Sequence, residues 1–154
     1  MTRAYAAFER LEVKDKVKHV RFLRRLSNVS IQLQENDKTI EYATEVAVHA
    51  LTDNDRGFAY DTLGLAYNAK GDYDKAIGYH EKALAIRLKA LGAEHPSVAL
   101  SYSNMGDAFA LKGDQIKAMT YFITAEWIFL NKLGAEHPNT KTIQSAIEAL
   151  RLKL

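Results

Sequence analysis

The sequence of 154 residues carries 21 Lys and Arg against 19 Asp and Glu, a formal net charge of +2, and it has no cysteine. This charge balance argues against nucleic acid as the partner, and the lack of cysteine excludes disulfides and thiolate metal sites. Because no run of 18 apolar residues and no apolar signal core occurs, we expect one soluble, cytoplasmic domain that does not insert into a membrane.

The chain begins with an expected N-terminal extension over residues 1–13, in which 2–10 form a short helix with Tyr5 and Phe8 able to dock on the helix after it. That second helix is expected over 14–34. Apolar residues recur along it at helical spacing and predict one buried stripe, formed by Val17, Val20, Leu23, Leu26, Val29 and Leu33.

The same helix also carries a basic face, because Lys14, Lys18, Arg21 and Arg25 are spaced at i, i+4, i+7 and i+11. Residues 1–34 hold eight Lys and Arg against three Asp and Glu, whereas residues 35–138 hold ten against fifteen. This polarity predicts contact between the four basic residues and an anionic partner. The alternative is a solvated helix face.

A repeat organises the centre of the chain. The hexapeptide LGAEHP occurs at 91–96 and again at 133–138, and residues 57–98 laid over 99–140 give 18 identities in 42. A fixed period of this length predicts stacked helical units. We expect one unit over 57–91 and one over 97–133, with helix pairs at 57–70 and 73–91, and at 97–112 and 115–132.

Two further segments complete the expected stack. Residues 14–51 are interpreted as a degenerate first unit, with a second helix over 37–51 capped by Asn36 or Asp37, because Ala43 and Ala50 match Ala76 and Ala83 at a shift of 33. In this alignment Ile31 stands where the other units have Gly64 and Gly106, the small residues expected where the two helices of a unit cross closely. The helix over 139–153 is expected to cap the end of the stack with Ile143, Ala146, Ile147 and Leu150.

The residues shared by the two clear units carry a family resemblance. Tyr60, Leu63, Gly64, Tyr67, Ala76 and Ala83, and their counterparts Tyr102, Met105, Gly106, Phe109, Ala118, Phe122 and Ala125, resemble the tetratricopeptide repeat signature. The period of 42 and the Leu-Gly-x-x-His-Pro loop resemble the kinesin light chain and nephrocystin subgroup. The resemblance implies an all-α, right-handed solenoid that binds a protein or peptide as an adaptor or scaffold.

In this family the first helix of each repeat lines a concave groove. Carried over by alignment, the predicted groove positions are Phe58, Asp61, Thr62, Leu65, Asn68, Leu100, Ser103, Asn104, Asp107 and Ala110. Their mixture of polar and apolar groups suits an extended peptide, and the two aspartates favour a ligand that carries Lys or Arg. None of the ten is basic, so a clamp for a terminal carboxylate is not predicted. The alternative is a merely solvated groove.

The helix over 115–132 departs from its counterpart at Ile123, Trp127 and Phe129. Ile123 and Trp127 share one helix face with Leu130. A tryptophan at an otherwise exposed position predicts an interface, either a homodimer or a partner contact. The alternative is that the helix over 139–153 buries the stripe.

The pattern of histidines and carboxylates predicts neither a metal site nor a catalytic site. His95 and His137 recur in the loop and are interpreted as caps, while His80 stands where Phe122 lies in the next unit, and a hydrogen-bonded, half-buried position is expected for it. No helical zinc spacing, phosphate loop or acid–base constellation occurs. We therefore expect no metal, no cofactor and no enzymatic activity.

Overall fold

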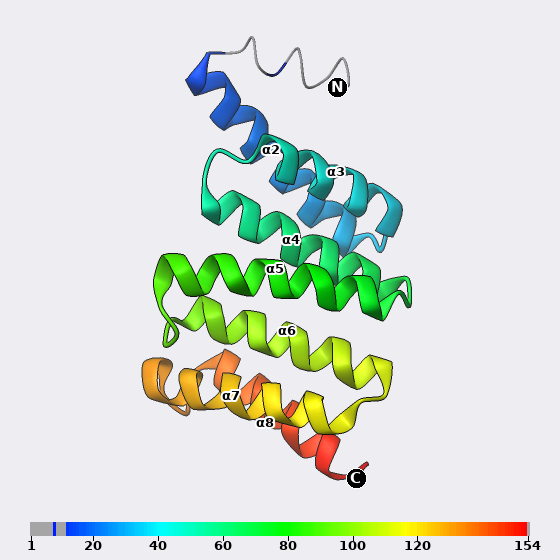
Figure 1. Ribbon diagram of the computed structural model, residues 1–154, viewed down its shortest axis with the longest axis vertical. Helices are drawn as coiled ribbons and strands as arrows, with labels where there is room; N and C mark the ends of the chain where they lie inside the picture. Colours follow the sequence, from blue (N-terminus) through cyan, green and yellow to red (C-terminus); the bar gives the residue numbers. More distant parts are fainter. Residues whose placement is uncertain (1–7, 9–11, 154) are drawn as a thin grey trace.

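The computed structural model describes residue 8 and residues 12–153, and this part of the chain forms seven α-helices and no strand. Each helix packs against the next, and the helices stack in chain order along one axis (Figure 1). The all-α solenoid is thereby confirmed. The helices are α2 (Val13–Gln32), α3 (Asn36–His49), α4 (Asp53–Ala69), α5 (Tyr73–Leu91), α6 (Pro96–Lys112), α7 (Gln115–Leu133) and α8 (Pro138–Arg151).

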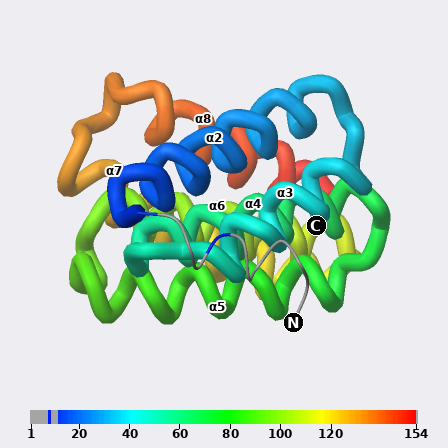
Figure 2. Tube along the Cα trace, turned by 90° about the horizontal axis from the view of Figure 1, so that it is seen from above, coloured from blue at the N-terminus to red at the C-terminus, as the bar shows by residue number. Residues whose placement is uncertain are grey.

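The helices form two layers. The first helices of the units, α2, α4, α6 and α8, lie behind α3, α5 and α7 in Figure 1. Seen along the stack, α2 and α8 lie on one side, α5 lies on the opposite side, and α4 and α6 lie between them (Figure 2). The row of first helices is therefore bent, and its inner side is the one on which the groove is predicted.

Two close helix crossings explain why glycine recurs after 42 residues. A Cβ atom on Gly64 would lie 2.4 Å from Cε1 of His80, and one on Gly106 would lie 2.4 Å from Cδ1 of Phe122. Both rings are buried. The ring of the second helix thus packs directly on the backbone of the first, and the two glycines have the same surroundings, as tiling by one repeated unit requires.

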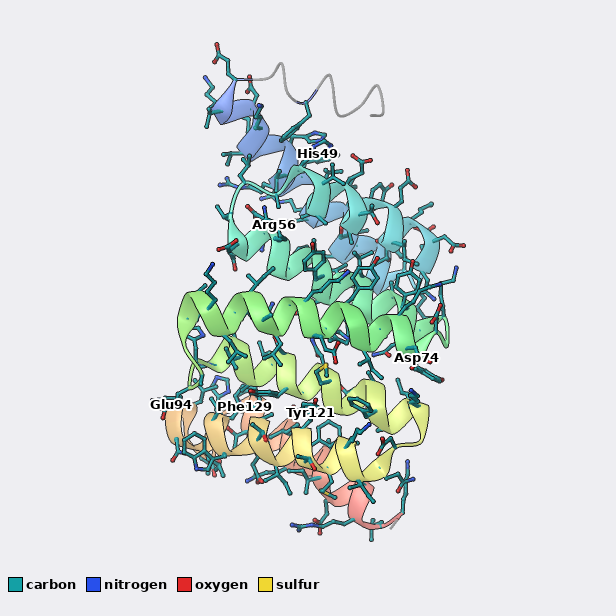
Figure 3. The ribbon with its side chains drawn as sticks, in the orientation of Figure 1. His49, Arg56, Asp74, Glu94, Tyr121 and Phe129 are labelled. Carbon is teal, nitrogen blue, oxygen red and sulfur yellow. The ribbon has the colours of Figure 1, made fainter. Side chains whose placement is uncertain are left out.

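Aromatic contacts repeat with the same period. Tyr67 and Tyr79 stack with their centroids 5.5 Å apart, and Phe109 and Tyr121 stack at 5.4 Å. Tyr121 lies in the middle of α7, as Figure 3 shows. Each stack joins the end of a first helix to the second helix of its own unit, so residues that are distant in sequence are held in register by equivalent packing.

Two glycine turns and two histidine caps follow from the local sequence. Gly71 and Gly113 adopt φ of 79° and 93°, the left-handed region that glycine enters at little cost. His95 and His137 cap α6 and α8, because Nδ1 of each accepts a hydrogen bond from a backbone N–H at 3.1 Å. The histidine caps are therefore confirmed.

The start of α4 differs from the expectation, because the helix begins at Asp53, four residues earlier. Thr52 is the cap: its hydroxyl accepts a hydrogen bond from the Asp55 backbone N–H at 3.1 Å and donates one to the Asp55 carboxylate at 2.7 Å. This reciprocal pair resembles a capping box, a signal that is present in the sequence as Thr-x-x-Asp. The expected caps of α3 are also wrong, since α3 begins at Asn36 and Glu35 precedes it with no side-chain cap.

The alignment of the first unit needs a correction. Gln34, with φ of 57°, occupies the turn position that Gly71 takes in the next unit. Lys70 pairs with Asp37 just as Lys112 pairs with Asp74, at 2.6 Å, near one end of α5 in Figure 3. The first unit is thus shifted by 37 residues and not by 33. This difference of about one helical turn leaves the buried face unchanged, so the apolar pattern cannot detect it.

In the corrected register Ser27, and not Ile31, matches Gly64. Ser27 is fully buried, and its hydroxyl donates a hydrogen bond to the Leu23 carbonyl at 2.9 Å. Ser30 is also buried and accepts a hydrogen bond from the Thr39 hydroxyl at 2.8 Å. The first unit therefore does have small residues at its helix crossing, with their hydroxyls satisfied in place of glycine.

The buried stripe of α2 also differs from the prediction. Val20, Leu23, Ser27 and Ser30 are buried, whereas Val17, Val29 and Leu33 are exposed. Each step of three residues is shorter than a helical turn of about 3.6 residues, so every residue in such a run lies farther around the helix than the one before it. A run at this spacing therefore cannot stay on one face.

Both ends of the stack agree with the expectation where they are described. Phe8 is buried, with its ring centroid 5.4 Å from that of His19 on α2. The rest of the helix expected over 2–10, including Tyr5, lies outside the described residues. At the other end, α8 buries Ile143, Ile147 and Leu150 and turns polar residues outward. It therefore covers the apolar end of α7 as a capping helix.

Candidate peptide-binding groove

The candidate groove is the inner side of the row formed by α2, α4 and α6. Leu65 on α4 and Leu100 on α6 are exposed there, as is Asp107. The remaining predicted positions on this surface are half-buried, namely Phe58, Ser103 and Asn104, with Ala110. Apolar groups and hydrogen-bonding groups thus alternate along two neighbouring helices.

Three predicted positions face into the protein instead. Thr62 is 3% exposed, Asp61 8% and Asn68 9%. The reason is that α4 lies between two other first helices, so that positions on both flanks of its groove face meet a neighbour. Only the positions at the centre of that face remain open.

The expected role of Asp61 does not hold. Its carboxylate accepts hydrogen bonds from the Arg87 guanidinium and from Nδ1 of His80, which lies 3.2 Å away. Arg87 also donates to the Ser101 hydroxyl at 2.6 Å. Arg87 offsets the charge of Asp61, so Asp61 does not attract a basic ligand. The half-buried position expected for His80 is also wrong, because the ring is fully buried in the crossing over Gly64.

Asp107 is the acidic residue left on the groove. Burial raises the pKa of its carboxyl, and the nearby His80 acts in the opposite direction. Asp107 as a whole is nevertheless exposed, so its carboxyl group remains accessible to a ligand.

The corrected register adds the first unit to the groove. With a shift of 37, Arg21, Arg24, Arg25 and Asn28 occupy the positions that Phe58, Asp61, Thr62 and Leu65 take on α4. A hollow of about 310 Å³ lies between α2 and the start of α4, and all four of these α2 residues line it. The ten positions predicted from the sequence omit this basic wall, because they come only from the two clear units.

The four basic residues singled out on α2 do not act together. Arg21 and Arg25 line the hollow. Lys18 pairs with Asp15 at 3.4 Å, and Lys14 is exposed outside the hollow. The spacing in the sequence places all four on one broad face of α2. The start of α4 forms the hollow beside the two arginines and not beside the two lysines.

The predicted interface stripe on α7 lies at the surface. Ile123 is 48% exposed, Trp127 54% and Leu130 38%. The helix α8 does not cover the stripe, because it packs on the side of α7 that holds Phe129, which is 1% exposed and labelled in Figure 3. The alternative of burial within the chain is therefore wrong for these three residues.

Neither a cluster of metal ligands nor a membrane-spanning helix occurs among the described residues. No group of three or more His, Cys, Asp or Glu side chains that could hold a metal ion occurs in this part of the chain. Among the same residues, no helix combines the length and apolar composition needed to cross a bilayer.

Comparisons with solved structures give the same fold. BtubC from P. vanneervenii has a TM-score of 0.79 and 19% identity, covering 98% of this chain and 63% of its own. The type III secretion translocator chaperone SycD of Yersinia enterocolitica has a TM-score of 0.69 and 18% identity, covering 87% of this chain and 84% of its own. Repeats of a putative kinesin light chain from Podosopora anserina have a TM-score of 0.74 and 23% identity, covering 85% and 64%.

At these identities the likeness shows the fold, and the chain spans about three fifths of the length of BtubC. No curated protein matches the sequence. The sequence profile of the tetratricopeptide repeat matches residues 55–131, half of the chain, over the segment in which the structure shows equivalent glycine crossings and aromatic stacks. The chain therefore belongs to the tetratricopeptide repeat family.

Proposed function

We propose that this protein is an interaction module, an adaptor or scaffold that acts by binding an extended peptide of a partner and not by catalysis. The observation that carries the proposal is the open surface of α4 and α6, where Leu65 and Leu100 are exposed beside Asn104 and Ser103. Apolar groups of this kind bind side chains, while amides and hydroxyls bind a peptide backbone.

A rigid platform lowers the entropic cost of such binding, because the groove need not be ordered when the peptide arrives. The crossings at Gly64 and Gly106 and the capping helix α8 fix the relative positions of the groove helices. SycD, which shares this fold, has been solved in complex with a peptide of the translocator YopD. That complex supports a peptide as the kind of ligand to test.

Selection of peptides displayed on phage against the purified protein tests the proposal. Binding of the enriched peptides is then measured by fluorescence anisotropy against Asn104→Ala combined with Asp107→Lys. We expect at least a tenfold loss of affinity, about the effect of losing one or two hydrogen bonds and reversing a charge. Glu81→Lys, an equal charge reversal at an exposed position of α5, is the control and should leave binding unchanged.

Two results would contradict the groove as the binding surface. One is the absence of any enriched peptide, and the other is equal affinity of the groove variant and the wild type. Circular dichroism of each variant ensures that a loss of binding is not a loss of helix.

Self-association is a second candidate, favoured by the exposed stripe of Ile123, Trp127 and Leu130 on the outer helix α7. Large apolar side chains that share one exposed helix face are typical of interfaces. Light scattering at high micromolar concentration should then give the mass of a dimer for the wild type and that of a monomer for Trp127→Glu. A wild type that remains monomeric would rule this candidate out.

A further inference from the structure

The hollow between α2 and the start of α4 is a continuation of the groove with a different chemistry. Its walls include the apolar side chains of Val17, Val20 and Leu51, while Arg21 and Arg25 stand on the same face of α2, one turn apart. Its volume of about 310 Å³ corresponds to about ten water molecules at roughly 30 Å³ each. It therefore has room for one or two side chains.

The third arginine of the hollow is already paired. Arg24 donates to the carboxylate of Asp55 at 2.8 Å, and its guanidinium lies over the ring of Phe58, 4.4 Å from the centroid. The other carboxylate oxygen of Asp55 accepts the Thr52 hydroxyl at 2.7 Å. The charges of Arg24 and Asp55 thus offset each other, and Arg24 is held in place by its pairing.

Arg21 and Arg25 have no such partners. Within the described residues neither forms an ion pair or a side-chain hydrogen bond, and both are exposed at the edge of the hollow. Two guanidinium groups one helical turn apart present a dense set of donors, suited to a planar oxyanion that accepts two hydrogen bonds at once. The hollow therefore carries uncompensated positive charge beside an apolar surface.

We propose that this hollow binds the side-chain carboxylate of an Asp or Glu residue in an extended partner peptide. The carboxylate pairs with Arg21 and Arg25, and an apolar residue next to it in the peptide packs on Val17 and Leu51. Asn28, which also lines the hollow, is placed to hydrogen-bond the peptide backbone. The inference rests on the proposed function and names the ligand chemistry at one end of the same groove.

The charges of the rest of the chain favour an acidic peptide over a nucleic acid. A nucleic acid strand would carry its phosphates along the groove toward Asp107 and over a segment, 35–138, that holds fifteen acidic residues against ten basic ones. Such repulsion disfavours a continuous polyanion. A single carboxylate flanked by uncharged residues meets a net positive charge in the hollow, because Arg24 offsets Asp55 and leaves Arg21 and Arg25 uncompensated.

Fluorescence anisotropy with two synthetic peptide pools tests the proposal. Both pools are fluorescein-labelled and C-terminally amidated, with uncharged random positions around a central Glu-Leu in one pool and Gln-Leu in the other. We expect the Glu pool to bind about tenfold more tightly or better, the effect of one charge-assisted hydrogen bond. The preference should weaken as salt is raised, since the arginines are exposed.

A matched pair of variants assigns the effect to the hollow. Arg21→Gln with Arg25→Gln should abolish the preference for Glu, whereas Lys14→Gln with Lys18→Gln removes the same charge from the same helix and should preserve it. Arg21→Lys with Arg25→Lys should give an intermediate preference, because lysine keeps the charge but loses the paired donors.

Several outcomes would overturn the inference. One is equal affinity for the Glu and Gln pools, and another is an equal loss of the preference for Glu in the variant that combines Lys14→Gln with Lys18→Gln. A third is binding at least tenfold tighter than that of the Glu pool, either by a phosphoserine pool or by an uncharged pool with a free C-terminal carboxylate. If phage-selected peptides bind through Asn104 and Asp107 while the Glu pool shows no preference, only this inference fails. If no selected peptide binds either, the proposed function fails with it.

Discussion

The crossing of α6 and α7 at Gly106 gives the sharpest test of the packing. Adding a Cβ atom there with Gly106→Ala would place it 2.4 Å from both Cδ1 and Cε1 of Phe122 and 3.1 Å from Cγ. The ring is 3% exposed and belongs to the buried core, so it cannot move aside without displacing its neighbours. Overpacking of this kind costs about 1–3 kcal/mol.

Part of this cost is offset, because alanine is favoured over glycine inside a helix by about 0.5–1 kcal/mol. We therefore expect Gly106→Ala to lower the free energy of unfolding by about 1–2 kcal/mol. For a domain of this size that corresponds to a fall in melting temperature of roughly 2–8 °C. Urea unfolding followed by far-UV circular dichroism measures the change.

Gly78 provides the matched control, since it also lies inside a helix but a Cβ atom there meets nothing within 4 Å. Gly78→Ala should stabilise the protein by about 0.5–1 kcal/mol, the helix-propensity gain alone. Phe122→Leu should relieve the clash, so that Gly106→Ala costs less in that background. The reasoning is refuted if Gly106→Ala stabilises as Gly78→Ala does, or if its cost is unchanged beside Phe122→Leu.

Two further predictions concern charges. Arg87→Met should lower the free energy of unfolding by about 3–5 kcal/mol, because it leaves the buried carboxylate of Asp61 without its cation. Lys112→Met breaks an exposed ion pair and should lower it by at most about 1 kcal/mol. Similar costs for the two variants in urea unfolding would contradict a buried Asp61 that depends on Arg87. Hydrogen bonds from the Lys117 backbone N–H, and to a lesser extent from its ammonium group, lower the pKa of Asp114 below its ordinary value of 3.8. The stabilisation that this provides is present above pH about 4 and is lost as the pH falls through the lowered pKa. The wild type should therefore unfold at a higher urea concentration than Asp114→Asn near neutral pH, and this difference should vanish in acid. A difference that does not change with pH would show that the charge of Asp114 is not involved.

Local features of this protein can be predicted from the sequence. The second helix of the second unit is expected over 73–91, and α5 spans Tyr73–Leu91. The caps formed by His95 and His137 are also predicted correctly. These features depend on residues within a few positions of each other, and each of them occurs in both clear units.

The candidate site is predicted less completely. Leu65, Leu100 and Asp107 are exposed, as a role in the groove requires, but Asp61 and Thr62 are buried. An alignment identifies the groove face of a helix, whereas exposure depends on how closely the next helix approaches. The sequence does not state that distance.

The sequence alone determined the repeat, the helix pairs and the glycine crossings, because these result from local propensity and from a period that is visible in the residues. Only the tertiary structure decided the register of the first unit and placed Arg21 and Arg25 beside one hollow. A shift of four residues returns nearly the same helix face, so the apolar pattern is indifferent to it. The turn at Gln34 and the ion pair of Lys70 with Asp37, which joins distant segments, settle the choice.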